Sequence, residues 1–428
     1  MRDDIRKRIE AVRRGEVPEG YVSENHQLRP CDWRYEKIGK YLVAYDEYSN
    51  DTEQYELATS SRQGLMLQTD YYSDQRFDET AGGFHVVPEG YITYRHMSDD
   101  DIFKFNVNQL GAPVLVSPEY PVFTTTDELR RDLLLEYLND SAEFRAFCRA
   151  QKKGSTRTRM YFSRLGEFSM PIPPKAEQQR ITEILSACDR VVELKQKLVE
   201  ELQQLKKTCL AKMFPQIGCA IPEIRFTEFT DPWEQRKFSE LVLIERGGSP
   251  RPIDDYITDA PDGLNWVKIG DAPEQGRYIT KTAEKIKPEG LSKTRQVQPG
   301  DLILSNSMSF GKPYIMGING CIHDGWLLIR DTQRRFDLKF LCHMLGTGQM
   351  LDQYRMFAAG STVNNLNKEL VGSTTVSLPS IEEQRVIGEY LESIDTLITL
   401  HQHEMEEVQQ KKKALMQLLL TGLVRVNA

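Results

Sequence analysis

Basic side chains gather around a short loop of small residues at positions 141–165. This stretch carries seven Arg and Lys side chains against one acid. Long hydrogen-bond donors around such a loop suit contacts with nucleic-acid phosphates and base edges. The other interpretation, a solvated basic turn, fits equally well. The side chains that would contact nucleic acid are Lys152, Lys153, Ser155, Thr156, Arg157, Arg159 and Tyr161.

A second group of candidates lies in the other half of the chain. Residues 360–365 read Gly-Ser-Thr-Val-Asn-Asn and are neutral, and an Asn side chain can pair bidentately with adenine. Such a difference between the halves is expected if they bind different sequences. The candidates for base contacts are Ser361, Thr362, Asn364 and Asn365, and those for phosphate contacts are Lys312, Arg246 and Arg251. Arg95, directly after a predicted strand in the first half, is a further candidate.

Patterns that would support catalysis are absent from the sequence. There is no GxxxxGK[ST] phosphate loop, no GxGxxG after a strand, no Asn/Asp-Pro-Pro-Tyr/Phe signature of amino-methyltransferases and no HExxH. The pair His401-x-His403 lies two residues apart on a predicted helix, so its members face different sides and cannot chelate a metal together. Residues 307–312 fit a surface turn aimed at a DNA phosphate better than a nucleotide site. We therefore expect no catalytic residue, cofactor site or metal site.

Composition limits the class of protein. With 428 residues the chain should form two to three domains. No run of eighteen apolar residues could span a membrane, and no apolar segment after Met1 resembles a signal peptide. Seven singly placed cysteines indicate a reduced, cytoplasmic setting. The net charge of −8 argues against nucleic acid when averaged over the chain, but a single basic face is enough for phosphate contact.

The chain repeats itself with a shift of 206 positions. The shift superposes residues 154–156 on 360–362, Glu177-Gln178 on Glu383-Gln384, and Lys206-Lys207 on Lys412-Lys413. Upstream the register drifts, but Trp33 and Trp233 still open the two copies and are expected to be core anchors. Two copies of one module follow from this pattern.

Each copy begins with short β-rich runs, continues into a strand that ends in proline, and finishes in a long helix from the Glu-Gln pair. Residues 177–214 would form a helix of roughly 57 Å. Heptad-like spacing predicts a coiled-coil seam, with Lys195, His401 and Glu404 as polar, register-setting members. The predicted seam is Ile181, Ile184, Cys188, Val191, Lys195, Leu198, Leu202, Leu205 and Cys209 in the first helix, and Ile387, Tyr390, Ile394, Leu397, His401, Glu404, Val408, Lys411, Leu415 and Leu418 in the second. Residues 3–15 predict a short helix packed on the first domain.

These features together resemble the type I restriction–modification specificity subunit family. The resemblance rests on the repeated Pro-x-x-x-Glu-Gln-x-x-Ile helix start, on Trp33-x-x-x-Lys37, and on the strand from Gly300 to Ser305. Residues 106–123 are similar to one class of the recognition domains of that family. The resemblance covers nearly the whole chain.

The resemblance implies an α+β fold with an internal pseudo-two-fold repeat. Two globular target-recognition domains of mixed α/β structure would be separated by two long conserved helices that form an antiparallel coiled coil. The expected segments are an N-terminal helix at 1–22, recognition domains at 23–176 and 217–382, and conserved helices at 177–216 and 383–428.

The resemblance also implies partners. The chain would read a bipartite target in double-stranded DNA, and the length of the helices would set the spacer between the two halves. Two modification subunits would dock on the helices and carry S-adenosylmethionine, and restriction subunits would use ATP and Mg²⁺. The alternative is a coiled-coil scaffold without nucleic-acid binding. Such a scaffold would not need the two basic segments, residues 141–165 and residues 277–295, the second of which carries six basic side chains against two acids. A third possibility is a DNA-binding component of another system, such as methylation alone or phage defence.

Overall fold

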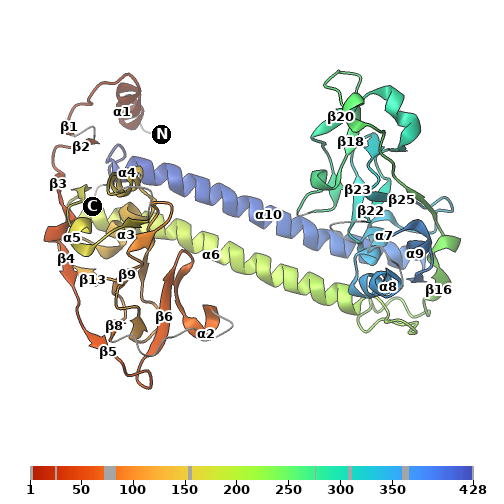
Figure 1. Ribbon diagram of the computed structural model, residues 1–428, viewed down its shortest axis with the longest axis horizontal. Coiled ribbons are helices and arrows are strands. Elements are labelled where there is room, and N and C mark those ends of the chain that lie inside the picture. The colour runs from red at the N-terminus through yellow and green to blue at the C-terminus, as the bar shows by residue number, and fades with distance from the viewer. Residues whose placement is uncertain are drawn as a thin grey trace. The chain divides into compact units, whose positions relative to one another are not determined.

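Two long helices begin directly after strands that end in proline. In the computed structural model, which describes residues 3–24, 27–71, 83–152, 157–274, 276–306, 311–358 and 366–426, these helices are α6 (Lys175–Lys212) and α10 (Ile381–Leu420) (Figure 1). They follow β15 (Ser169–Ile172) and β26 (Thr375–Leu378). Each begins two residues before the Glu-Gln pair at which the sequence analysis placed its start. Glu177 and Glu383 therefore lie in the first turns, where the helix dipole favours a carboxylate.

The contacts between residues divide the chain into two units. Unit 1 comprises Met1–Val192 and Glu407–Ala428, and unit 2 comprises Glu193–Glu406. Each unit thus contains one globular part together with one portion of α6 and one portion of α10. The mixed helix and strand content and the repeated organisation confirm the predicted fold class.

In unit 1 the globular part contains a four-stranded sheet in the order β11-β9-β13-β4 and a five-stranded sheet in the order β5-β8-β12-β6-β7. The strands are β4 (Leu42–Ala44), β5 (Tyr48–Ser49), β6 (Glu56–Ser61), β7 (Gly64–Leu67), β8 (Phe84–Val87), β9 (Ile92–Tyr94), β11 (Phe105–Val107), β12 (Val114–Val116) and β13 (Val122–Thr125). Apolar side chains of the first sheet pack with α3 (Arg131–Asp140), α4 (Ala142–Ala150) and α5 (Phe162–Leu165) to form the main core.

Smaller elements complete unit 1. Two-stranded pairs are formed by β1 (Tyr21–Glu24) with β2 (Gln27–Pro30), β3 (Arg34–Lys37) with β15, and β10 (Met97–Ser98) with β14 (Thr158–Arg159). A short helix, α2 (Gln68–Tyr71), follows β7. The predicted N-terminal helix is confirmed as α1 (Asp3–Arg13), but it buries no residue. It is instead attached by a hydrogen bond from Arg8 Nη1 to the Leu423 carbonyl (3.1 Å).

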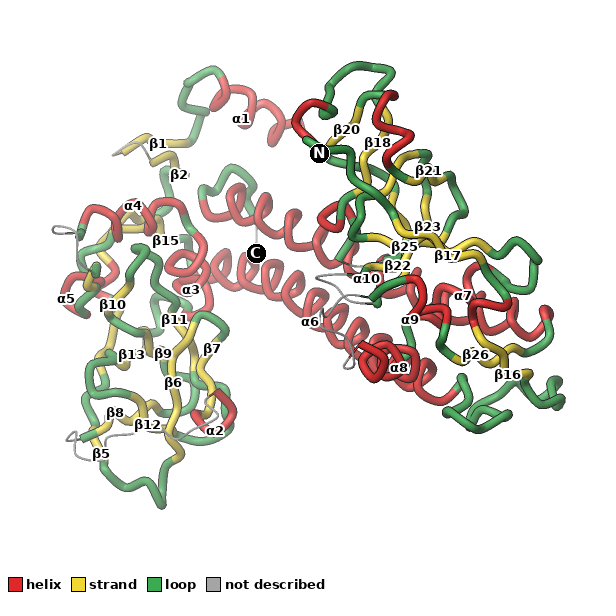
Figure 2. Tube along the Cα trace, turned by 45° about the vertical axis from the view of Figure 1, so that its right-hand side comes forward, coloured by secondary structure: helices red, strands yellow, loops and turns green. Residues whose placement is uncertain are grey.

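Unit 2 contains a five-stranded sheet in the order β17-β25-β22-β23-β19 and a four-stranded sheet in the order β20-β18-β24-β21. Figure 2 shows β17, β22, β23 and β25 side by side. The central strand β22 is buried along its whole length, as its apolar Leu-Ile-Leu run predicts. The strands are β17 (Leu243–Arg246), β18 (Leu264–Val267), β19 (Tyr278–Ile279), β20 (Glu284–Ile286), β21 (Arg295–Val297), β22 (Leu302–Ser305), β23 (Pro313–Met316), β24 (Gly320–Ile322) and β25 (Trp326–Arg330).

The remaining elements of unit 2 join its sheet to the long helices. β16 (Glu234–Lys237) pairs with β26, as β3 pairs with β15 in unit 1. The helices α7 (Leu338–Leu345), α8 (Gly348–Ala358) and α9 (Lys368–Gly372) contribute apolar side chains to the main core. That core also contains residues of α6 and α10, so the long helices are an integral part of the unit.

The long helices form an antiparallel pair, but the predicted seam is wrong at alternate positions. Val191, Leu198 and Leu205 are exposed, whereas Val199 is buried. The inward positions are Ile181, Leu185, Cys188, Val192, Lys195, Val199, Leu202, Lys206 and Cys209 on α6, and Ile387, Leu391, Ile394, Ile398, His401, Met405, Val408, Lys412 and Leu415 on α10. These sets are equivalent under the shift of 206.

The physical reason lies in the phase of the heptad. Both phases alternate steps of three and four residues and both are rich in apolar side chains on α6, so spacing alone does not distinguish them. The observed phase turns Lys206 inward to form an ion pair with Asp395 of α10 in unit 2. Its repeat equivalent Lys412 forms an ion pair with Asp189 of α6 in unit 1 (2.8 Å).

The start of each long helix is fixed by the same set of contacts. Trp33 Nε1 donates a hydrogen bond to Glu177 (2.9 Å), and Trp233 Nε1 donates one to Glu383 (3.2 Å). Both tryptophans are buried, which confirms them as core anchors. The residue after each glutamate, Gln178 or Gln384, is also buried. Its side-chain amide donates hydrogen bonds to two backbone carbonyls, and its side-chain oxygen accepts one from a backbone amide.

Candidate nucleic-acid interface

In unit 1 a short strand pair places the candidate Arg159 opposite Met97, two residues after the candidate Arg95. β10 and β14 pair antiparallel, so that Met97 lies opposite Arg159 and Ser98 opposite Thr158. Arg95, which directly precedes this pair, is exposed and lines a hollow of about 340 Å³. Arg62 and Lys104 line the same hollow, together with one acid, Asp99.

Several of these basic side chains already have acidic partners. Arg157 Nε donates to Asp99 (2.7 Å), and Lys152 Nζ lies 3.5 Å from Asp101. Arg62 forms a third ion pair with Asp100 (2.5 Å). The basic residues come from three different segments, whereas the acids are consecutive.

The aromatic pair after β14 divides between surface and core. Tyr161 is exposed and stacks on His96, with ring centroids 5.8 Å apart, while Arg159 Nη1 donates to its hydroxyl (3.4 Å). Phe162 instead packs against Phe123 in the core. Tyr161 therefore presents a ring and a hydroxyl at the basic surface, whereas Phe162 does not. Lys153, Ser155 and Thr156 lie outside the described residues.

In unit 2 two of the basic candidates, Arg246 and Arg251, meet at the turn between β24 and β25. Arg246, Arg251 and Lys312 are all exposed. Arg246 Nε donates to the Asp324 carbonyl (3.3 Å), and Arg251 Nη2 lies 3.6 Å from the Asp324 carboxylate. The structure thus brings side chains from separate loops to one place.

Asn306 and Ser305 connect the third basic candidate, Lys312, to the same turn. Its side-chain amide donates to the Asp324 carbonyl (2.9 Å), and its backbone amide donates to the Gly325 carbonyl (2.9 Å). Ser305, directly before it, exchanges hydrogen bonds with Lys312. The other candidates, Ser361, Thr362, Asn364 and Asn365, lie outside the described residues, but Leu366, which follows that segment, donates to the Asn306 carbonyl (3.1 Å).

Two glycines permit the close approach of the loops in unit 2. A Cβ atom on Gly247 would lie 2.2 Å from the His323 carbonyl oxygen, and one on Gly248 would lie 2.4 Å from the Lys293 carbonyl oxygen. Real Cβ atoms do not approach backbone oxygens so closely, so a side chain at either position would force the backbone apart. Glycine at 247 therefore lets the loop of Arg246 and Arg251 lie against the β24–β25 turn, and glycine at 248 lets it lie against Lys293 and Thr294.

The acidic and amide residues that bond to the basic side chains or join the loops were not predicted from the sequence. They are Asp99, Asp101, Asn306 and Asp324. The run Asp99-Asp100-Asp101 was a visible signal, because three consecutive acids near a basic segment offer partners for its cations. Asn306 and Asp324 gave no comparable signal, since their roles depend on contacts between loops that lie far apart in the sequence.

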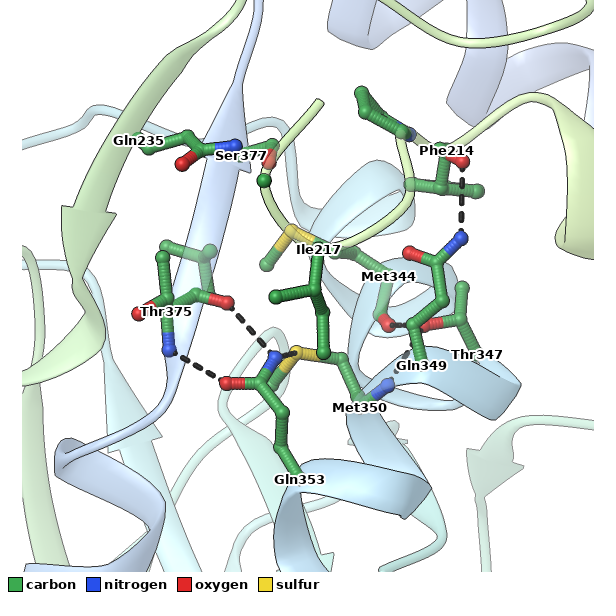
Figure 3. A pocket seen from close by; sticks show the side chains of 13 residues that line it. Phe214, Ile217, Gln235, Met344, Thr347, Gln349, Met350, Gln353, Thr375 and Ser377 are labelled. Carbon is green, nitrogen blue, oxygen red and sulfur yellow. Dashed lines mark hydrogen bonds between the residues drawn. The ribbon is translucent and has the colours of Figure 1, made fainter. Parts of the chain in front are cut away.

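Two cavities of unit 2 differ in size and enclosure. The pocket in Figure 3 is lined by Phe214, Ile217 and Met350, and the Gln353 side chain bonds both backbone groups of Thr375 there. Its volume of about 30 Å³ accommodates roughly one water molecule. A larger cleft of about 1100 Å³ is open and is lined by Arg251 and Lys268 together with the acids Asp254 and Glu284.

One group of described side chains has the composition of a metal site. His343, Glu392 and Asp395 place possible ligand atoms within 4.8 Å of one another. However, Lys206 and Arg277 already form ion pairs with the two oxygens of Asp395. Burial, assisted by the charges of Arg277, Lys206 and Lys339, lowers the pKa of His343 to about 2. An environment that disfavours one added positive charge also disfavours a divalent cation.

Among the described residues, no helix combines the length and the apolar character needed to cross a membrane.

Comparisons with known proteins agree with this architecture. The family model for the type I restriction modification DNA specificity domain matches residues 87–204 and 230–410, which is one match in each half of the chain. The MjaVIII type I restriction enzyme specificity subunit of Methanocaldococcus jannaschii is 26% identical over 425 residues, which cover 94% of this chain and 96% of that protein. The putative MjaX specificity subunit of the same organism is 26% identical over 83% of this chain and 86% of that protein.

Solved structures show the same fold at low sequence identity. The type I restriction–modification S subunit from M. genitalium superposes with a TM-score of 0.58 at 14% identity, covering 92% of this chain and 97% of that one. A chain from a structure describing complex assembly and conformational transition of the type I R-M system gives a TM-score of 0.55 at 15% identity, covering 92% and 98%. The chain therefore belongs to the type I restriction–modification DNA specificity family and is a non-catalytic subunit that recognises DNA sequence.

Proposed function

We propose that the chain reads a bipartite sequence in double-stranded DNA, with one half bound by each recognition domain, 23–176 and 217–382. The observation that carries this proposal is that each unit has its own loop-built cluster of exposed basic side chains, around Arg157 in unit 1 and around Arg251 in unit 2, in which these two arginines are paired with aspartates. The two surfaces are built from different residues, which favours two different half-sites. The proposed DNA contacts are Arg95, Lys152, Lys153, Ser155, Thr156, Arg157, Arg159 and Tyr161 in the first domain, and Arg246, Arg251, Lys312, Ser361, Thr362, Asn364 and Asn365 in the second.

The conserved helices, 177–216 and 383–428, are the proposed docking elements for two modification subunits. Leu194 and Leu198 of α6 and Leu397 and Leu400 of α10 are exposed within unit 2. Exposed apolar side chains along a helix favour contact with another protein. In this assembly the modification subunits would hold S-adenosylmethionine, and restriction subunits would use ATP and Mg²⁺. The natural setting is the cytoplasm, where genomic DNA is the substrate.

The experiment that tests the proposal is co-purification with a neighbouring modification subunit, followed by mapping of adenine methylation in cells with and without the chain. We expect a split motif with a fixed spacer to be methylated only when the chain is present. Unchanged methylation together with no captured methyltransferase would contradict the proposal. Transformation of the same cells with unmethylated plasmid then distinguishes restriction from methylation alone.

Matched variants separate the two surfaces from the docking helices. Arg157→Ala should weaken DNA binding roughly five-fold, because one phosphate or base contact is lost. Arg236→Ala, on β16 and away from the proposed DNA contacts, should leave DNA binding unchanged. The double variant Leu194→Glu and Leu198→Glu should reduce the co-purified modification subunit. Ile221→Glu replaces an equally exposed apolar residue outside both long helices, and it should leave co-purification unchanged.

A further inference from the structure

The Asp324 carboxylate lies among the basic side chains proposed to contact DNA in unit 2. Its Oδ2 is 3.6 Å from Arg251 Nη2, and its Oδ1 accepts a hydrogen bond from the Ser249 hydroxyl (3.1 Å) and lies 2.9 Å from His323 Nδ1. The Asp324 backbone carbonyl separately accepts bonds from Arg246 and Asn306. The backbone of this residue therefore holds the loops together, and its side chain supplies a negative charge to Arg251.

In unit 1, too, basic side chains proposed to contact DNA are paired with aspartates. Arg157 and Lys152, both proposed DNA contacts, form ion pairs with Asp99 and Asp101. In both units, therefore, basic side chains that could bind a DNA phosphate are already ion-paired with a carboxylate. Such pairing at the basic surfaces also accords with the overall net charge of −8.

A carboxylate in this position affects different DNA sequences unequally. Binding to non-target DNA depends almost entirely on phosphate contacts and counterion release. An ion pair that must open before each phosphate contact forms opposes that binding, and the carboxylate then faces the phosphates as a like charge. Binding to the target includes base contacts as well, which offset the same cost.

We infer that Asp324 is a specificity-determining residue that acts through Arg251: it restrains this guanidinium in the absence of target DNA and thereby lowers affinity for non-target sequences. Asp324 is a positioning residue in this role, since DNA would be contacted by Arg251 and not by the carboxylate. The inference rests on the proposed DNA-binding surface of unit 2.

Asp324→Asn tests this directly, because it removes the charge while an amide oxygen can still accept the Ser249 hydrogen bond. The assay uses the full chain assembled with its modification subunits. It measures affinity for a duplex that carries the mapped motif and for a duplex of the same composition with the motif scrambled, over a series of salt concentrations. Circular dichroism and the melting temperature check that the variant is folded.

For Asp324→Asn we expect the affinity for the scrambled duplex to rise about five-fold, with a much smaller rise for the target. The slope of log K against log salt for the scrambled duplex should steepen by about 0.9, because one more cation becomes available to phosphate. Arg251→Ala combined with Asp324→Asn should abolish both effects. A purely structural role for Asp324 would change neither the slope nor the ratio of affinities in this direction.

Asp254→Asn is the matched control. Asp254 lines the same cleft as Arg251, is exposed, and makes no ion pair among the described residues. An equal effect of Asp254→Asn and Asp324→Asn would overturn the inference, since general charge removal would then explain both. Weaker binding of Asp324→Asn to both duplexes would also overturn it. If the wild-type complex does not distinguish the two duplexes, the proposed function itself fails, and this outcome is separate from the others.

Discussion

Lys195 of α6 and His401 of α10 are equivalent residues of the repeat, and they contact each other: Lys195 Nζ lies 3.1 Å from His401 Nδ1. Glu404 accepts a hydrogen bond from the same Lys195 and lies 2.8 Å from the same ring nitrogen. Two equivalent positions of a repeat meet only near a two-fold axis that relates the copies. The portions of α6 and α10 in unit 2 therefore have local two-fold symmetry at this point.

The corrected helix phase gives a direct test with neighbouring residues. Val199 is 3% exposed and Leu198 is 36% exposed. Val199→Asp places an unpaired charge between the helices and should lower the free energy of unfolding by about 3 kcal/mol. Leu198→Asp should change it by less than about 0.5 kcal/mol. Urea denaturation of the two variants measures the difference, and similar losses for both would contradict the observed phase.

Buried ion pairs at the helix starts should be essential to stability. Arg225 donates two hydrogen bonds to Glu383, whose side chain is 2% exposed. Arg225→Gln leaves that carboxylate without its cation and should lower the free energy of unfolding by about 3 kcal/mol. The double variant Arg225→Gln and Glu383→Gln should recover part of the loss, because no uncompensated charge remains. A double variant less stable than the single variant would argue against this explanation.

Glu136 should make the stability of unit 1 depend on pH in an unusual direction. Burial raises the pKa of Glu136, although Lys412 beside it opposes the rise. A carboxyl with a raised pKa in the folded state contributes stability at low pH, and this contribution is lost as the pH rises through the folded-state pKa. The wild type should therefore lose stability relative to Glu136→Gln as the pH increases from about 4 to about 7.

Denaturant unfolding of the two proteins across this range measures the difference. Comparison with Glu136→Gln cancels the other carboxyl groups, many of which titrate in the opposite sense. A constant difference between the two proteins would show that Glu136 does not titrate differently in the folded state.

The close packing of Gly247 predicts a local defect when a methyl group is added. Gly247→Ala must separate its loop from the β24–β25 turn, because the new atom would meet backbone and not a movable side chain. We expect a loss of about 1–3 kcal/mol in stability and faster hydrogen exchange at residues 323–325. Gly348→Ala adds the same methyl group where nothing lies within 4 Å, and it should show neither effect.

The sequence predicted those parts of the structure that depend on local order. Proline after a strand, followed by Glu-Gln, located both helices to within two residues, and the repeat located both buried tryptophans. The helix seam could not be assigned fully, because Leu198 and Val199 are both apolar and only the partner helix determines which is buried. The surface of unit 2 was predicted only as separate basic residues, since Asp324 links Arg246, Arg251 and Asn306 through contacts between distant segments.

The ion pair of Glu177, at the start of α6, also bears on how the chain folds during synthesis. Glu177 of unit 1 forms an ion pair with Arg425, and the core of that unit includes Met416, Leu419 and Leu420. Unit 2 is one continuous stretch, Glu193–Glu406. On the ribosome, unit 2 has all of its residues before unit 1 does, although residues 1–192 of unit 1 precede it in the sequence. The core of unit 1 and its ion pair at the start of α6 therefore stay incomplete until residues 416–425 have been translated.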